Sequence, residues 1–233
     1  MVAENLKNIQ ERLAAACIAA GRNPGSVTLI AVSKTFGPQE VAEVTRAGVL
    51  DIAENYVQEL TRKRDELADD RIRWHFIGHM QSNKVKYISD WIYMIHSVDN
   101  DRVAAEIQKR GEKLGRPMNV LVEVNTSGET TKYGVKPEGA LDLVRTISRH
   151  PNIAIQGLMT IGPFEPEPEG SRRSFRQLKN LFDQINSAAV LRQPMIHLSM
   201  GMSHDFTVAI EEGSTMVRIG TAIFGSRTYP NLN

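Results

Sequence analysis

Short apolar segments rich in β-branched residues alternate along the chain with polar loops and with segments whose apolar residues recur at helical spacing. The apolar segments predict strands at residues 27–34, 49–54, 74–78, 93–98, 120–125, 153–160, 196–200 and 216–220. The helical spacing predicts helices at residues 3–20, 38–47, 56–67, 82–89, 101–114, 137–150, 171–190 and 203–212. Strands that alternate with helices in this way form a parallel sheet whose faces are covered by helices.

A closed barrel fits this order of elements better than an open sheet. The chain has no glycine-rich dinucleotide fingerprint after its first strand, and its length of 233 residues suits one barrel. We therefore predict the α/β class and a single (β/α)8 TIM-barrel domain over residues 1–233. The segment after the last strand is too short for a full helix, so the extra N-terminal helix is expected to fill that position.

Composition narrows the classes of function. The formal net charge is +1, which argues against a dedicated nucleic-acid surface, and no apolar run approaches the ~18 residues of a membrane span. The N-terminal segment carries charges at helical spacing and does not resemble a signal peptide, so we expect a cytoplasmic protein. Cys17 is the only cysteine, which excludes an internal disulfide and fits a packing role. No spacing of His, Cys and carboxylates predicts a metal site.

Lys34 is the first candidate for chemistry. Side chains alternate along a strand, so Ile30, Val32 and Lys34 share one face, and Lys34 ends the strand where barrel enzymes build their sites. A lysine that loses water there is biased toward the neutral amine, which attacks carbonyl groups. The alternative is a lysine whose ammonium group simply reaches solvent at the strand end.

The last predicted strand carries a second candidate. Arg218 interrupts an apolar run and shares a face with Met216 and Gly220, and a buried arginine needs a partner. Gly220 and Thr221 offer backbone N–H groups and a hydroxyl that suit a phosphate. An arginine in an internal salt bridge followed by a turn glycine is the alternative.

The segment around Ser199 and Ser203 supplies further phosphate donors. A strand runs into Ser199, a glycine turn follows, and a helix is expected to open near Ser203, where unpaired N–H groups bind anions. An ordinary serine N-cap is the alternative. In a closed barrel the eighth strand lies between the seventh and the first, about 4.8 Å from each. Lys34 then stands beside a phosphate site, as pyridoxal 5′-phosphate (PLP), an aldehyde that carries a phosphate, would require.

Six segments, in this order along essentially the whole chain, resemble the pyridoxal phosphate homeostasis proteins. They lie at residues 31–35, 54–59, 74–78, 157–159, 198–203 and 217–225. The family in turn resembles the barrel domain of alanine racemase. One departure is His79, which stands where the family leads us to expect a small or apolar residue.

The resemblance implies a role for each candidate. Lys34 would form the Schiff base with PLP, and Arg218 would face the pyridine nitrogen. The phosphate would be held by Ser199, Ser203, Gly220 and Thr221 with nearby backbone amides, and the ring pocket would be lined by Asn55, His75 and Met159. His75 has the alternative of a hydrogen-bonded core histidine. Lys132, in the loop after the fifth strand, is either a second acceptor of the aldehyde or a solvated lysine, and the proline-rich loop 162–170 is expected to be an exposed connector.

Two classes of function remain from the sequence. The resemblance favours a PLP carrier that takes part in vitamin B6 homeostasis, delivers PLP to apoenzymes by transient contact, and acts as a monomer without enzymatic turnover. The alternative is a PLP-dependent racemase-like enzyme, which would need a second acid or base opposite Lys34. A barrel that binds a nucleotide or sugar phosphate would leave Lys34 unexplained.

Overall fold

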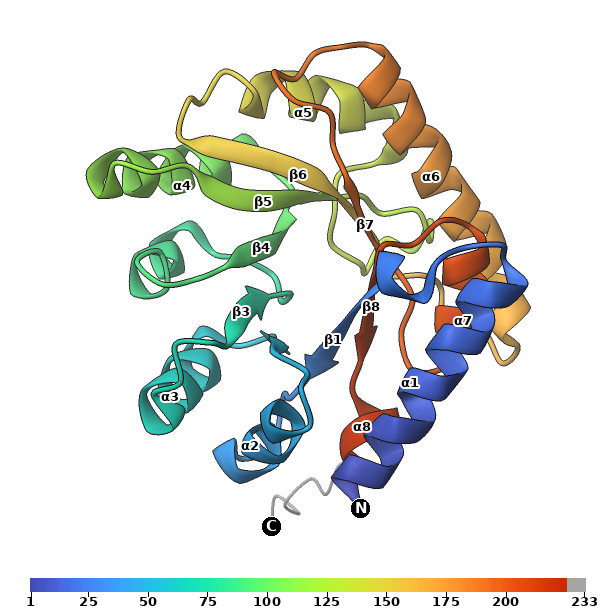
Figure 1. Cartoon of the computed structure of the whole chain (residues 1–233). Coiled ribbons are helices and arrows are strands. Elements are labelled where there is room, and N and C mark those ends of the chain that lie inside the picture. Colours follow the sequence, from blue (N-terminus) through green and yellow to red (C-terminus); the bar gives the residue numbers. More distant parts are fainter. Residues whose placement is uncertain (226–233) are drawn as a thin grey trace.

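Eight parallel strands close into a barrel in the computed structural model, which describes residues 1–225 (Figure 1). Neighbours along the chain are neighbours in the barrel, and β8 closes it against β1. The fold class predicted from the sequence is confirmed. The strands are β1 (Thr28–Val32), β2 (Asp51–Glu54), β3 (Arg73–Phe76), β4 (Met94–Val98), β5 (Met118–Glu123), β6 (Ile153–Met159), β7 (His197–Ser199) and β8 (Met216–Ile219).

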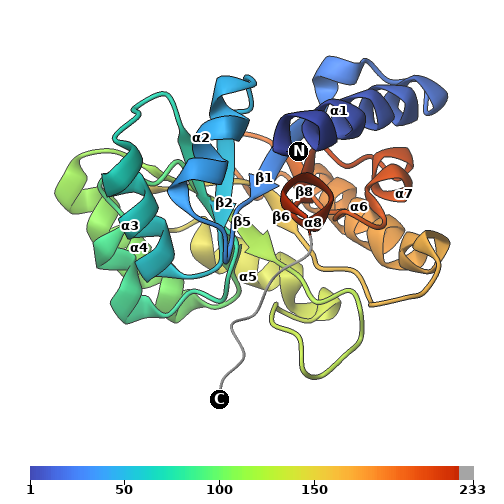
Figure 2. The ribbon, with the colours of Figure 1, turned by 90° about the horizontal axis from the view of Figure 1, so that it is seen from below.

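Helices surround the barrel, as Figures 1 and 2 show. The α-helices are α1 (Val2–Ala19), α2 (Pro38–Arg46), α3 (Val57–Leu67), α4 (Asp101–Leu114), α5 (Ala140–Ile147), α6 (Arg172–Ser187), α7 (Phe206–Glu211) and α8 (Thr221–Phe224). Short 3-10 helices are η1 (Pro24–Ser26), η2 (Ser82–Tyr87), η3 (Pro137–Gly139) and η4 (Pro168–Ser171).

Two predicted helices differ from the structure. Residues 82–89 form only the 3-10 helix η2, because few of its side chains are apolar and Val85 is the one that is buried. The helix predicted to open at Ser203 begins at Phe206 instead. Asp205 explains the delay: its carboxylate accepts the Met202 N–H at 2.7 Å, which holds residues 202–205 in a turn before the helix starts.

The N-terminal helix α1 packs beside α7 and α8 and fills the position after the last strand, as predicted (Figures 1 and 2). Its buried face contributes Leu6, Ile9 and Cys17 to the core between helices and strands. Asn5 donates from its amide nitrogen to the Ile223 carbonyl oxygen at 3.0 Å, which ties α1 to α8. The burial of Cys17 agrees with its expected packing role.

The barrel interior has an apolar part and a polar part. Its apolar cluster consists of Ile30, Val32, Ala53, Met94, Leu121, Met159 and Met216. Other buried positions of the strands carry polar groups, among them Asp51, His75, His96, Glu123, Ser199 and Arg218. The parallel register explains how Arg218 enters the interior: it pairs with Ile30, whose side chain belongs to the interior cluster.

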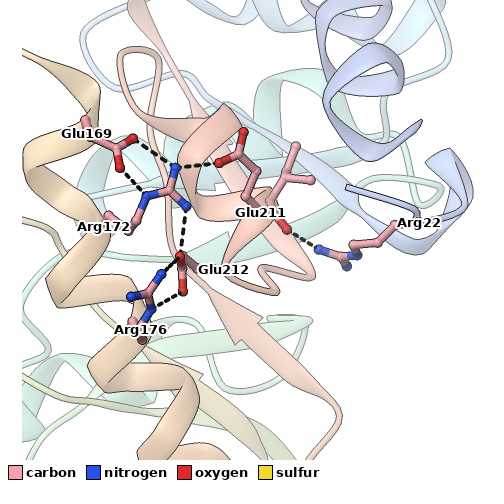
Figure 3. A network of polar contacts seen from close by, with 7 residues as sticks. Arg22, Glu169, Arg172, Arg176, Glu211 and Glu212 are labelled. Carbon is pink, nitrogen blue, oxygen red and sulfur yellow. Dashed lines mark hydrogen bonds and ion pairs between the residues drawn. The ribbon is translucent and has the colours of Figure 1, made fainter. Parts of the chain in front are cut away.

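An ion-pair network on the outer surface joins the start of α6 to the end of α7 (Figure 3). The Arg172 guanidinium contacts Glu169, Glu211 and Glu212, and Arg176 also contacts Glu212. Networks of this kind stabilise more than isolated surface pairs do. The network therefore fastens the base of the loop after β6 to the helix that follows β7.

A buried ion pair fixes the end of β1. Lys63 of α3 is fully buried, and its Nζ contacts the Glu54 carboxylate and donates to the Ser33 carbonyl oxygen at 2.7 Å. Ser33 also donates from its hydroxyl to Glu54 Oε1 at 2.6 Å. Together these bonds hold the residue that precedes Lys34.

Replacing Lys63 by Met should lower the free energy of unfolding by about 3–5 kcal/mol, because Glu54 and the Ser33 carbonyl would stay buried without their cation. Urea denaturation followed by circular dichroism measures the loss. Arg62→Met is the matched control on the same helix, because Arg62 pairs with Glu66 in solvent and such pairs contribute only about 0.3–0.5 kcal/mol. Equal effects of the two substitutions would contradict the role of the buried pair.

Candidate functional site

A cavity of about 320 Å³ opens at the carboxyl ends of the strands, where barrel enzymes carry their sites. Its volume lies at the lower end of the range for small-molecule sites, about 300–1,000 Å³. The walls come from the segments after β1, β2, β3, β6, β7 and β8. Its lining residues are Val32, Lys34, Asn55, Ile77, Ile161, Pro163, Phe164, Glu165, Met202, Ser203, His204, Asp205, Arg218, Gly220 and Thr221.

Lys34 lies in the cavity wall two residues beyond β1. The backbone on both sides of it is anchored: Ser33 is bound by Glu54 and Lys63, and the Thr35 N–H donates to Glu59 Oε2 at 3.0 Å. Thr35 has φ of 72°, a conformation that is rare for a β-branched residue and persists only where neighbouring bonds enforce it. The turn therefore fixes the backbone position from which the Lys34 side chain enters the cavity.

Arg218 also lines the cavity, although its side chain is 4% exposed. Its guanidinium donates to the Ser199 hydroxyl oxygen at 2.6 Å and to the Thr160 carbonyl oxygen at 2.8 Å. Among residues 1–225 no carboxylate lies within ion-pair distance of it, so the internal salt bridge considered from the sequence is not formed there. Burial lowers the pKa of Arg218 to about 10, while Glu123 and Asp205 oppose that effect, so the group remains a cation at neutral pH.

The segments after β7 and β8 bring hydrogen-bond donors together at the cavity. The Ser203 hydroxyl oxygen accepts the backbone N–H groups of Gly220 and Ala222, each at 3.3 Å, and Thr221 lies beside them. Gly220 fits closely against β1, because a Cβ there would lie 3.2 Å from the Val32 carbonyl oxygen. The Ser203 and Thr221 hydroxyl groups can donate to an anion here, and the Gly220 and Ala222 N–H groups lie beside them.

Asn55 supplies a polar atom that lacks a partner. Its Oδ1 is buried, and no hydrogen-bonding group among residues 1–225 reaches it. Gly78 permits the close approach that places Asn55 here, since a Cβ at residue 78 would lie 2.0 Å from the Asn55 carbonyl oxygen. A buried polar side chain without a partner at a cavity wall indicates a ligand that satisfies it.

Three residues expected at the site lie in the barrel interior and do not line the cavity: His75, Met159 and Ser199. The register of the strands explains their depth. Ser199 ends β7, but it pairs with Met216, the first residue of β8, and therefore lies below Arg218. Its hydroxyl oxygen accepts from Arg218 and lies 3.0 Å from His96 Nδ1. The assignments of Ser199 to a phosphate and of His75 and Met159 to the ring pocket stay predictions.

Lys132 does not line the cavity. Its Nζ donates to the Gly162 carbonyl oxygen at 2.7 Å and pairs with Glu129, so it joins the loop after β5 to the loop after β6. The loop 162–170 is more than a connector, because Pro163, Phe164 and Glu165 lie in the cavity wall. His79, the departure from the family pattern, stacks on Tyr133 with ring centroids 3.9 Å apart.

Glu123 is a functional candidate that sequence reasoning missed. It ends β5 on the same face as Leu121, which is buried in the barrel interior, and its own side chain is buried. Burial raises the pKa of Glu123 to about 7, the Asp99 carboxylate adds to the rise, and Arg218 opposes it. Side-chain alternation along the strand could have predicted this residue, as it predicted Lys34, because Glu123 is an acid on the interior face at the end of a strand.

Neither a metal centre nor a membrane span is found in the part of the chain that the structure describes. Within residues 1–225, His, Cys, Asp and Glu side chains do not gather in groups of three or more that could hold a metal ion. The helices in the same range are too short or too polar to cross a bilayer.

Comparison with known proteins gives consistent results across the whole chain. A family profile described as "Alanine racemase, N-terminal domain" matches residues 3–228. A protein of Aquifex aeolicus named pyridoxal phosphate homeostasis protein is 46% identical over 226 residues, which cover 97% of this chain and 98% of the relative. The solved structure of PipY from Synechococcus elongatus with PLP bound is 31% identical, with a TM-score of 0.83 over 97% of this chain and 100% of PipY.

Enzymes share the fold at much lower identity. The alanine racemase of Clostridium difficile is 17% identical, with a TM-score of 0.73 over 98% of this chain and 58% of the racemase. This likeness extends to the fold alone.

The raised pKa of Glu123 predicts a pH dependence of stability. An acid whose pKa rises from 4.5 to about 7 on folding favours the folded state while it is protonated, and this contribution is lost as the pH rises through about 7. Glu123→Gln should therefore gain stability over the wild type by about 2–3 kcal/mol more at pH 8 than at pH 5.

Urea denaturation at both pH values measures this difference. Glu112→Gln, on the exposed side of α4, controls for the change in net charge. A difference between wild type and Glu123→Gln that does not change with pH would contradict the raised pKa.

Proposed function

Because this chain belongs to the family of pyridoxal phosphate homeostasis proteins, we propose that its cavity binds PLP and that the chain takes part in intracellular PLP homeostasis. The observation that carries the proposal is the convergence on one cavity of an amine, a cluster of hydroxyl and amide donors, and a buried cation. PLP offers a matching partner to each: an aldehyde, a phosphate and a pyridine nitrogen. The buried Asn55 Oδ1 without a partner supports a polar ligand at the same place.

Lys34 is the residue we propose to hold PLP covalently. Its neutral Nζ would attack the aldehyde carbon, and the carbonyl oxygen would leave as one molecule of water, which gives a Schiff base. The anchored backbone around Lys34 supports this role, because the amine then needs little ordering before it reacts. The bond is reversible by hydrolysis, as a carrier that releases PLP requires.

The phosphate would lie against Ser203, Gly220 and Thr221, where the donor cluster faces the cavity. Ser199, predicted as a further phosphate donor, lies deeper, and its hydroxyl also bonds within the barrel interior. Arg218 would face the ring nitrogen and Asn55 a polar substituent of the ring. Arg218 offers donors only, so it binds an unprotonated nitrogen and opposes its protonation.

The same residue disfavours PLP-dependent transamination and decarboxylation, whereas racemisation tolerates it. PLP enzymes stabilise a carbanion by drawing its electrons into the pyridine ring, and an unprotonated ring is a weak electron sink. Relatives carry the name of homeostasis proteins. We therefore propose a monomeric cytoplasmic protein that delivers PLP to apoenzymes through transient contacts. A racemase-like enzyme is the second candidate, and the observation that favours it is His204 in the cavity wall, a group able to transfer protons.

Borohydride reduction of the protein loaded with PLP should fix the cofactor on the peptide that contains Lys34. Lys34→Ala should lose the reducible adduct and the visible absorbance of the Schiff base, because no other lysine lines the cavity among the described residues. Lys132→Ala is the matched control and should retain both. Peptide mass mapping that finds the label on Lys132 or on a surface lysine would refute the assignment.

Turnover of amino acids should be negligible if the protein is a carrier. The loaded protein would be incubated with L- and D-alanine, L-serine and L-glutamate in deuterated water, and α-proton exchange would be followed by NMR. We expect exchange well below about 1 s⁻¹, the low end of ordinary enzyme turnover. Faster exchange that His204→Gln abolishes would establish the racemase-like alternative.

A further inference from the structure

A continuous chain of buried hydrogen bonds crosses the barrel interior from the cavity toward the opposite end. The Arg218 guanidinium donates to the Ser199 hydroxyl oxygen at 2.6 Å, and this oxygen lies 3.0 Å from His96 Nδ1. His96 Nε2 lies 2.9 Å from His75 Nδ1, and His75 Nε2 lies 3.0 Å from Asp51 Oδ1. All five side chains are buried, so each bond forms without competition from bulk water.

The chemistry of the two ends fixes the direction of every bond. Asp51 as a carboxylate only accepts, so His75 donates from Nε2, and a neutral His75 accepts at Nδ1. His96 must then donate from Nε2 and accept at Nδ1, which receives the Ser199 hydroxyl proton. Arg218 only donates, and it meets the Ser199 oxygen. With both histidines neutral, each is thus an Nε2–H tautomer, and every proton points from Arg218 toward Asp51.

The electrostatic surroundings favour this state. Desolvation lowers the pKa of His75 and lowers that of His96 well below its ordinary value, with His75, Arg218 and His197 adding to the effect on His96. Burial alone would raise the pKa of Asp51, but hydrogen bonds from His75 and Arg73 bring it below its ordinary value. Tyr93 adds its ring, edge to face with His75, and Glu123 faces Arg218 from β5.

We propose that Asp51, His75, His96 and Ser199 are positioning residues, which form a hydrogen-bond relay of fixed direction that holds the Arg218 guanidinium at the cavity. Without the relay the guanidinium would retain only the Thr160 carbonyl oxygen as a hydrogen-bond acceptor among the described residues. In the relay the Ser199 hydroxyl donates its proton to His96 Nδ1 and accepts from Arg218 at its oxygen. The consequence for ligand binding rests on the proposed function, but the direction of the relay does not.

Asp51 offers a test far from the cavity. It begins β2 at the opposite end of the barrel, where it also forms an ion pair with the half-exposed Arg73. Arg73 donates to both oxygens of this carboxylate, and its contact with Oδ2 is the shorter one. In Asp51→Asn we expect the carbonyl oxygen of the amide to keep the Oδ2 position, so that the NH₂ group faces His75. His75 would then move its proton to Nδ1, and His96 would follow. Arg73→Ala breaks the same ion pair but leaves the carboxylate on His75, which makes it the matched control.

The histidine tautomers are read by ¹⁵N NMR of the ligand-free protein labelled on histidine, with signals assigned from His75→Gln and His96→Gln. The wild type and Arg73→Ala should show both histidines as neutral Nε2–H tautomers between pH 6 and 8, a range bracketing the ordinary histidine pKa of about 6.5. Asp51→Asn should show Nδ1–H tautomers. Affinity for PLP, measured by absorbance titration, should fall by about tenfold in Asp51→Asn, because the oriented state of Arg218 is less populated.

A charged or Nδ1–H histidine in the wild type would overturn the relay. So would unchanged tautomers in Asp51→Asn, or the same change in Arg73→Ala as in Asp51→Asn. The tautomers are measured without ligand, so they decide the direction of the relay even if the wild type binds no PLP, a result that would refute the proposed function instead.

Discussion

The burial of the Arg218 cation inside a closed barrel is the constraint on which the site depends. An isolated charge in such an interior is unstable, and it persists only with hydrogen bonds and compensating charge. Ser199 and Thr160 supply the hydrogen bonds, while Asp205 and, above a pH of about 7, Glu123 supply negative charge at longer range. The polar groups in the barrel interior continue from this residue, since Ser199 Oγ accepts from Arg218 and also lies 3.0 Å from His96 Nδ1.

The residues that face the cavity are held by bonds outside it. Lys63 and Glu54 fix the turn that carries Lys34, and Asp205 fixes the turn that carries Ser203 through its bonds to the Met202 N–H and the Ser171 hydroxyl. The ion pairs of Arg172 and Arg176 join α6 to α7 from outside. Sites built on such supports need little reorganisation when a ligand arrives, which favours binding.

Strand alternation was sufficient to predict the fold and the residues nearest the cavity. It placed Ile30, Val32 and Lys34 together on one face of the first strand and Met216 and Arg218 together on one face of the last, and both faces turn out to be the interior of the barrel. It could not give the depth of a residue in the barrel, because the stagger between strands is set by packing across the whole interior. Ser199 and His75 were expected at the cavity for that reason, although both lie below it.

Tertiary contacts between distant segments were the other part that the sequence could not show. Burial, and after it the Asp99 carboxylate, raises the pKa of Glu123. Lys63 is buried because Glu54 and Ser33, which bind its Nζ, lie beneath α3. A lysine in a helix rich in charged residues gives no local sign of burial. The helix expected to begin at Ser203 begins at Phe206, because the Asp205 carboxylate accepts the Met202 N–H and holds the preceding residues in a turn.

A crystal structure of the protein grown with PLP would show which residues hold the cofactor. We expect electron density that is continuous with Lys34 Nζ, a phosphate bound by Ser203 and Thr221, and a ring nitrogen that faces Arg218. PLP bound outside this cavity, or linked to another lysine, would contradict this expectation.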